Sequence, residues 1–177
     1  VDAAAEERIA AAMPPGLFIS LSSRVLPEVR EYERGMATWL NAWLGPRVAG
    51  YLGRLGEKLA GVPVSVMQSA GDTVAAAQAA QNAVRMLLSG PAGGLVAAQR
   101  IGETGGAPRL LTFDMGGTST DVALIQNSRA RVRRETFVGD VRVRAPSVDV
   151  HLLRSPQTPS SAPPGGAAAS YQYPICS

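Results

Sequence analysis

The sequence predicts an α/β fold with a mixed sheet, and three observations support this prediction. Apolar residues recur at three- and four-residue spacings between positions 31 and 60, which is typical of an amphipathic helix. Apolar runs of strand length, separated by polar or glycine-rich turns, follow residue 109. A hydrophobic share of 46% over 177 residues is enough to bury a core.

The composition excludes several classes of protein. Only 5% of residues are aromatic, and the net charge is +3. The arginines of 129–134 and 142–144 alternate with apolar residues, as expected on the solvent-exposed faces of strands. These features argue against nucleic-acid binding. A single cysteine, Cys176, cannot form an internal disulfide, so we expect a reducing, cytoplasmic location. No run approaches the roughly 20 apolar residues of a membrane helix, so we expect no membrane contact.

The sequence of the first third of the chain predicts two helices and a strand. The Ala/Glu-rich residues 3–13 predict a short helix, and the alternation over Leu17 to Leu21 predicts a buried strand. A long helical pattern covers about 31–60. Gly45-Pro46 lies inside it, so we expect a kink or a break into two helices there.

Shorter elements follow this helix. The pattern predicts a strand over 63–67, a helix of about ten residues capped by Thr73, and a further strand over 84–88. Trp39 and Trp43, on the long helix, are expected in core or interface packing rather than in a cofactor site.

A glycine-rich segment opens the next predicted helix, over about 95–101. Glycines at a helix N-terminus offer free N–H groups and the positive end of the helix dipole, which together suit an anion. Close packing of the helix against a sheet explains the same glycines equally well. The candidate anion-binding residues are Ser89, Gly90, Gly93 and Gly94.

The most informative segment is a strand, a turn and a strand, predicted over 109–114 and 121–126. Two glycines in the turn permit positive φ and close approach to a ligand, and successive N–H groups there can form an anion-binding concavity. A plain hairpin is the alternative. The candidate phosphate-binding residues are Gly116, Gly117, Thr118 and Ser119. Asp114 ends the first strand and could hold Mg²⁺ through water. Asp121 is expected rather to cap the turn, although it could also reach a metal-bound water.

Two more strands are expected over about 130–137 and 141–146. They lead to Asp149 and His151, which a single strand would place on one face because its period is two. The pair could bind substrate or metal. Two ligands do not define a metal site, so a structural pair is the favoured interpretation.

These segments resemble the hydantoinase A/5-oxoprolinase family, within the actin/sugar kinase/Hsp70 ATPase superfamily. The resemblance covers about residues 17–151, in the family's order. It rests on R-E-Y-E-R at 30–34, N-A-W-L-G-P at 41–46, M-Q-S-A-G at 67–71, S-G-P-A-G-G at 89–94, D-M-G-G-T-S-T-D at 114–121 and P-S-V-D-V-H at 146–151.

The resemblance implies a central fragment of such an enzyme, forming part of a ribonuclease H-like or actin-like ATPase lobe. It implies ATP and Mg²⁺ as cofactors, a small cyclic amide such as 5-oxoproline or a hydantoin as substrate, and a B-type partner subunit or domain. Asp114 would then be the catalytic acid that positions Mg²⁺ or the attacking group.

Two parts of the family pattern have no match. No first phosphate loop precedes residue 110, and residues 152–177 replace the expected adenosine-binding loop with a Pro/Ser/Ala-rich segment that predicts disorder. We therefore divide the chain into a partial enzyme domain, 1–151, and a divergent tail. We expect the chain alone to be inactive. The alternatives are a non-catalytic remnant or interaction module, and a relative of ketone carboxylase subunits.

Overall fold

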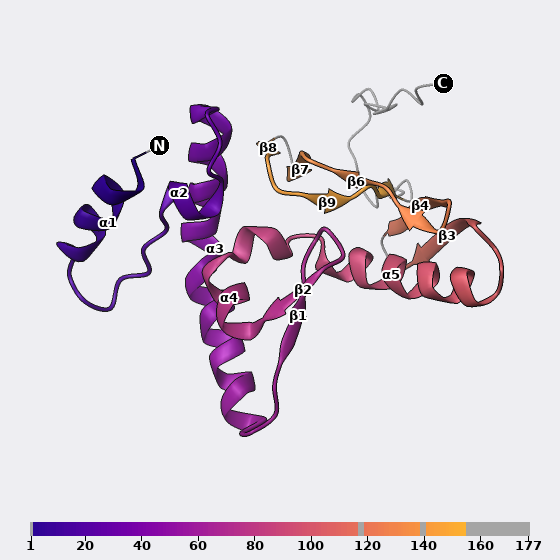
Figure 1. The fold of residues 1–177 in the computed structure, drawn as a ribbon, viewed down its shortest axis with the longest axis horizontal. Helices are drawn as coiled ribbons and strands as arrows, with labels where there is room; N and C mark the ends of the chain where they lie inside the picture. The colour runs from indigo at the N-terminus through magenta and orange to yellow at the C-terminus, as the bar shows by residue number, and fades with distance from the viewer. Residues whose placement is uncertain (1, 117–118, 139–140, 155–177) are drawn as a thin grey trace, which may run out of the picture.

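The structure, a computed structural model, describes residues 2–116, 119–138 and 141–154. It combines helices with short strands, as the sequence predicts (Figure 1). The helices are α1 (Ala3–Ala11), α2 (Ser22–Val25), α3 (Glu31–Lys58), α4 (Ala76–Gln81), the 3₁₀ helix η1 (Ala83–Met86) and α5 (Ser89–Thr104). None of these helices is long and apolar enough to cross a membrane.

The strands form four small sheets. They are β1 (Ser65–Met67), β2 (Thr73–Ala75), β3 (Arg109–Met115), β4 (Ser119–Gln126), β5 (Arg129–Ala130), β6 (Val132–Arg133), β7 (Thr136–Val138), β8 (Val141–Val143), β9 (Ser147–Val148) and β10 (His151–Arg154). The largest sheet has the order β10-β4-β3, with β5 also on β4; the others pair β1 with β2, β6 with β9, and β7 with β8. Every pairing in the described ranges is antiparallel.

The N-terminal helix forms as predicted. The Asp2 carboxylate accepts hydrogen bonds from the amides of Ala4 and Ala5, which caps α1. Glu6 then joins α1 to α2 by accepting from the Ser22 hydroxyl and from the Ser23 amide. These hydrogen bonds, that from Ser22 foremost, lower the pKa of Glu6 to about 2.

The prediction of a strand over Leu17 to Leu21 is wrong, because this segment pairs with no strand. It runs instead beside α3, where the Phe18 ring lies directly over Gly45 and the Ser20 hydroxyl accepts a hydrogen bond from Asn41. The expected break in α3 is also absent: the helix continues through Pro46, although proline removes one bond from its ladder.

The prediction that the tryptophans pack in the core is also wrong. Trp39 and Trp43 are 57% and 58% exposed, whereas α3 buries a face of smaller residues. That face packs against α2, α4 and η1, and its buried residues are Ala37, Leu40, Asn41, Gly45 and Leu52. Interface packing of the tryptophans, the other expectation, stays a prediction.

A fully buried amide organises the elements after α3. The Asn41 side chain donates to the carbonyl of Gln81 and accepts from the amide of Val84. Residues 83–86 thus form a 3₁₀ helix where a strand was predicted, because a side chain rather than a neighbouring strand satisfies their backbone. Thr73 does not cap a helix; it lies in β2 opposite Met67, while β1 confirms the strand predicted over 63–67.

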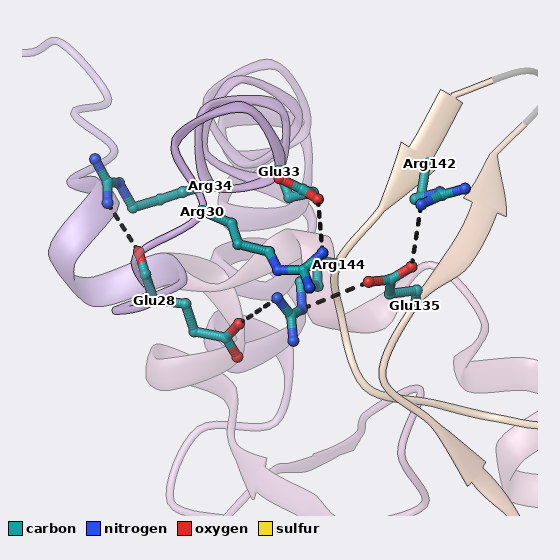
Figure 2. A network of polar contacts seen from close by, with 7 residues as sticks. All are labelled: Glu28, Arg30, Glu33, Arg34, Glu135, Arg142 and Arg144. Carbon is teal, nitrogen blue, oxygen red and sulfur yellow. Dashed lines mark hydrogen bonds and ion pairs between the residues drawn. The ribbon is translucent and has the colours of Figure 1, made fainter.

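An ionic network connects the start of α3 with the β7–β8 hairpin (Figure 2). The mostly buried Arg144 guanidinium lies 2.8 Å from a Glu28 carboxylate oxygen and 3.8 Å from Glu135. The Arg34 guanidinium donates to the carbonyl of Glu28, and Arg30 pairs with Glu33. The R-E-Y-E-R segment therefore fixes the entry to α3.

The C-terminal half packs its largest sheet on α5. Helix α5 begins at Ser89, six residues earlier than predicted, so the glycine-rich segment forms its first turns. One cluster of buried residues joins Ala92 and Leu95 of α5 to Ala123 and Val148. The predicted strand over 130–137 is divided among β5, β6 and β7, which belong to three different sheets.

Two glycines of α3 provide a test of this packing. Replacing an exposed helical glycine by alanine stabilises a helix by roughly 0.5–1 kcal/mol, and Gly53→Ala should do so because its added methyl group meets open space. Gly45→Ala should instead lower the free energy of unfolding by about 1–3 kcal/mol, since its methyl group would overlap the Phe18 ring. Urea unfolding followed by circular dichroism measures both. Equal stabilisation by the two variants would contradict the packing of Phe18 on α3.

Candidate phosphate and metal site

Two carboxylates lie directly opposite each other where β3 ends and β4 begins. The antiparallel register pairs Asp114 with Asp121. Side chains alternate between the faces of a strand, so Asp121 shares its face with the buried Ala123 and Ile125. This is the face that α5 covers. Both acids therefore project from the α5 side of the sheet.

The order of contacts along α5 places this acid pair near one end of the helix. Ala92, in the first turns of α5, shares a buried cluster with Ala123 of β4. Gly102, in the last turn, lies under the side chain of Leu110 at the beginning of β3, opposite the end of β4. Strand β4 thus runs from the N-terminal toward the C-terminal half of α5. Asp121, two residues before Ala123, lies toward the N-terminal side of the helix.

The two carboxylates repel each other. Burial raises the pKa of Asp121, and the neighbouring charge of Asp114 raises it further. Among the described residues, neither acid has an ion-pair partner. A pair of oxygen donors without a counter-charge fits a hard divalent cation such as Mg²⁺, which binds one or two carboxylates and completes its shell with water and phosphate oxygens.

The turn beside the acids is partly described. The Gly116 amide donates a hydrogen bond to the Ser119 carbonyl, 2.9 Å away, so this N–H is used within the turn. Gly117 and Thr118 lie outside the described residues. Ser119 begins β4 and is half-buried. The turn thus brings the backbone of Gly116 and Ser119 next to the acid pair.

The three glycines in the first turns of α5 face open space. A Cβ atom added at Gly90, Gly93 or Gly94 would meet no described atom within 4 Å, so the explanation from close packing against the sheet is wrong for these three residues. Ser89 is the first residue of the helix. The glycine surface therefore leaves room for a ligand to approach the N-terminal turns of α5.

Asp149 and His151 do not share a strand. Strand β9 ends at Val148 and β10 begins at His151, so Asp149 lies in the connection. Its side chain is 10% exposed and pairs with Arg133, whose Nε lies 2.6 Å from Oδ1; the exposed His151 Nε2 is 3.9 Å away. No group of three or more potential metal ligands occurs in the described part of the chain. This arrangement supports the structural interpretation of the pair.

Sequence reasoning missed the residue that positions α5. The Ser69 hydroxyl accepts a hydrogen bond from the Leu88 amide, directly before the helix, and the Ser69 carbonyl accepts from Val148 of β9. The M-Q-S-A-G segment was the available signal, since a small polar residue in a buried turn can satisfy several backbone groups. No sequence pattern indicated that Arg133 pairs with Asp149.

The fold agrees with the family resemblance. The sequence model of the hydantoinase/oxoprolinase family matches residues 34–154, which is more than half of the chain. The protein belongs to this family.

Two curated relatives illustrate the range of names within it. The chain is 31% identical over 143 residues to caprolactamase subunit alpha of Pseudomonas jessenii, covering 78% of this chain and 20% of the relative. It is 32% identical over 160 residues to 5-oxoprolinase 1 of Arabidopsis thaliana, covering 88% of this chain and 12% of that enzyme. The chain thus spans a fifth or less of the length of these relatives.

A solved structure shares the fold. A nucleotide-free structure of acetone carboxylase, an enzyme described as acting by ATP-dependent acetone carboxylation, superimposes with a TM-score of 0.64 at 25% identity. The match covers 76% of this chain and 19% of that one.

The acid pair makes stability depend on pH. Because the folded-state pKa of Asp121 is raised, the native state binds a proton more tightly than the unfolded chain. The free energy of unfolding should fall as pH rises from 3.8 through the raised pKa. Asp121→Asn should remove this dependence and stabilise the metal-free chain at pH 7 by about 0.2–1 kcal/mol. Urea unfolding between pH 4 and 7 measures both effects.

The exposed Asp72 provides the matched control. Asp72→Asn should change the free energy of unfolding by less than about 0.5 kcal/mol at pH 7. If Asp121→Asn destabilised the chain at pH 7 without added metal, the proposed repulsion would be wrong.

Proposed function

We propose that the chain supplies one phosphate-binding loop to an enzyme that hydrolyses cyclic amides with ATP. The observation that carries the proposal is the pair Asp114 and Asp121, opposite each other beside a glycine turn and toward the N-terminal side of α5. A helix N-terminus and a glycine turn favour phosphate, and paired carboxylates favour the accompanying cation.

The chemistry explains why such a site is needed. An unstrained lactam is a poor electrophile, and Mg-ATP, when bound, supplies the phosphoryl group that activates its oxygen. Asp114 and Asp121 would hold the cation. Ser119 and the first turns of α5, from Ser89 to Gly94, would contact the phosphates. Catalysis of phosphoryl transfer depends chiefly on positioning and charge neutralisation, which these residues provide without covalent participation.

The relatives support the substrate class. Caprolactamase and 5-oxoprolinase are named for cyclic amides, caprolactam and 5-oxoproline. The caprolactamase chain is one subunit of its enzyme, so we also propose that a second, B-type subunit or domain contributes to the active site.

A ketone carboxylase is the second candidate function. The observation that favours it is the structural match to acetone carboxylase, which covers 76% of this chain. Activation of an enolate oxygen by ATP would use the same phosphate loop. Because the acid pair would serve either reaction, the two candidate functions are distinguished by the substrates that the enzyme uses.

The test uses the full-length enzyme that contains this chain. We expect ADP release to depend on a cyclic amide, and Asp114→Asn to reduce the rate about 100-fold or more, since metal-assisted charge neutralisation contributes several kcal/mol. The matched control is Asp72→Asn, which changes an exposed carboxylate elsewhere and should retain activity. Lactams, hydantoins and acetone with bicarbonate should be compared as substrates.

Each result has a separate meaning. Full activity of Asp114→Asn would remove this acid from the site. ADP release that depends on acetone and bicarbonate, with none on any lactam, would replace the hydrolase proposal with the carboxylase.

A further inference from the structure

Helix α3 carries an exposed row of aromatic and cationic residues that no described part of the protein covers. We call it the aromatic stripe, and it consists of Tyr32, Trp39, Trp43, Arg47 and Arg54. At 100° per residue these positions fall within about 80° of helix circumference. Tyr32 is 70% exposed, and both tryptophans are more than half exposed. Large exposed aromatic side chains grouped in this way mark an interaction surface.

The centre of the stripe is ordered by stacking. The rings of Trp39 and Trp43 lie 6.4 Å apart between centroids and are inclined by only 6°. The Arg47 guanidinium lies over Trp43, 5.6 Å from the ring centroid. These side chains hold one another in place, which reduces the entropy that a partner would have to remove on binding.

The two halves of the stripe differ in character. Its N-terminal half is aromatic, with Tyr32 and Trp39, whereas its C-terminal half is cationic, with Arg47 and Arg54. No acidic residue occurs in α3 between Glu33 and Glu57. Cations are attracted to the faces of aromatic rings, so each half of the stripe is complementary to the other half.

We propose that the aromatic stripe binds a second copy of this chain, with the two α3 helices antiparallel and the two-fold axis at Trp43. In this register Arg47 faces the partner's Trp39, and Arg54 faces the partner's Tyr32. Trp43 meets the partner's Trp43 on the axis. Every contact occurs twice, as an isologous interface requires. This inference is independent of the proposed function.

The available area suits such a pair. A fully buried aromatic side chain contributes about 150–250 Å², and the three on the stripe are all more than half exposed. They account for roughly 300–400 Å² on each partner, about half of the roughly 800 Å² typical of a stable interface. The exposed arginine stems and the neighbouring Tyr51, which is 60% exposed, extend the surface.

Sedimentation equilibrium of the full chain, from 1 to 100 µM, tests the proposal. The wild type should dimerise, and Arg47→Glu should weaken the dimer at least tenfold because it places an anion over the partner's Trp39. Arg47→Lys, which keeps the charge, should retain most of the association. Arg100→Glu is the matched control: it makes the same change of charge at an exposed position of α5 and should leave the dimer intact.

Circular dichroism should show all three variants folded, since Arg47 and Arg100 are exposed. A wild type that stays monomeric at 100 µM would overturn the proposal, as would a dimer that Arg47→Glu leaves unchanged. Partition of the monomer onto anionic phosphatidylserine vesicles, without dimerisation, would show instead that the stripe serves a membrane surface.

Discussion

One buried serine connects the parts of this structure on which the candidate site depends. The Ser69 amide donates to the Arg85 carbonyl of η1, its hydroxyl accepts from Leu88 before α5, and its carbonyl accepts from Val148 of β9. The residue is 2% exposed, so water cannot replace these bonds. Each backbone group left without a partner at such a position would cost about 1–3 kcal/mol. Ser69 therefore fixes where α5 begins relative to both halves of the chain.

The position of α5 then determines the position of the acids. Its Ala92 and Leu95 pack with Ala123, and this contact sets which face of β4 lies against the helix. Because side chains alternate along a strand, the same contact turns Asp121 toward the helix side, and the register brings Asp114 opposite. A hydrophobic contact thus holds two like charges together. Such an arrangement is unfavourable in the metal-free fold, and binding of the proposed divalent cation would relieve it.

The sequence predicted well those elements whose own pattern determines them. Helix α1, the body of α3, and β3 with β4 follow their periodicity. Predictions failed where residues far apart in the sequence determine the local structure. Leu17 to Leu21 has the alternation of a strand but lies on α3, where Phe18 packs over Gly45. Residues 83–86 form a 3₁₀ helix because Asn41 and Ser69 satisfy their backbone groups. The candidate acids were identifiable from the turn between the strands. Their direct opposition was not, because the register depends on a turn length that periodicity does not specify.

The central claim is that Asp114 and Asp121 form a divalent cation site on this chain. The most direct measurement is a titration of the ¹⁵N-labelled chain with Mn²⁺, whose paramagnetism broadens amide signals near the bound ion even at low occupancy. The account predicts that broadening is strongest at Asp114 and over Ser119 to Asp121, and that excess Mg²⁺ reverses it. Strongest broadening at another acid, such as Asp72, or broadening spread evenly over the surface carboxylates would contradict it.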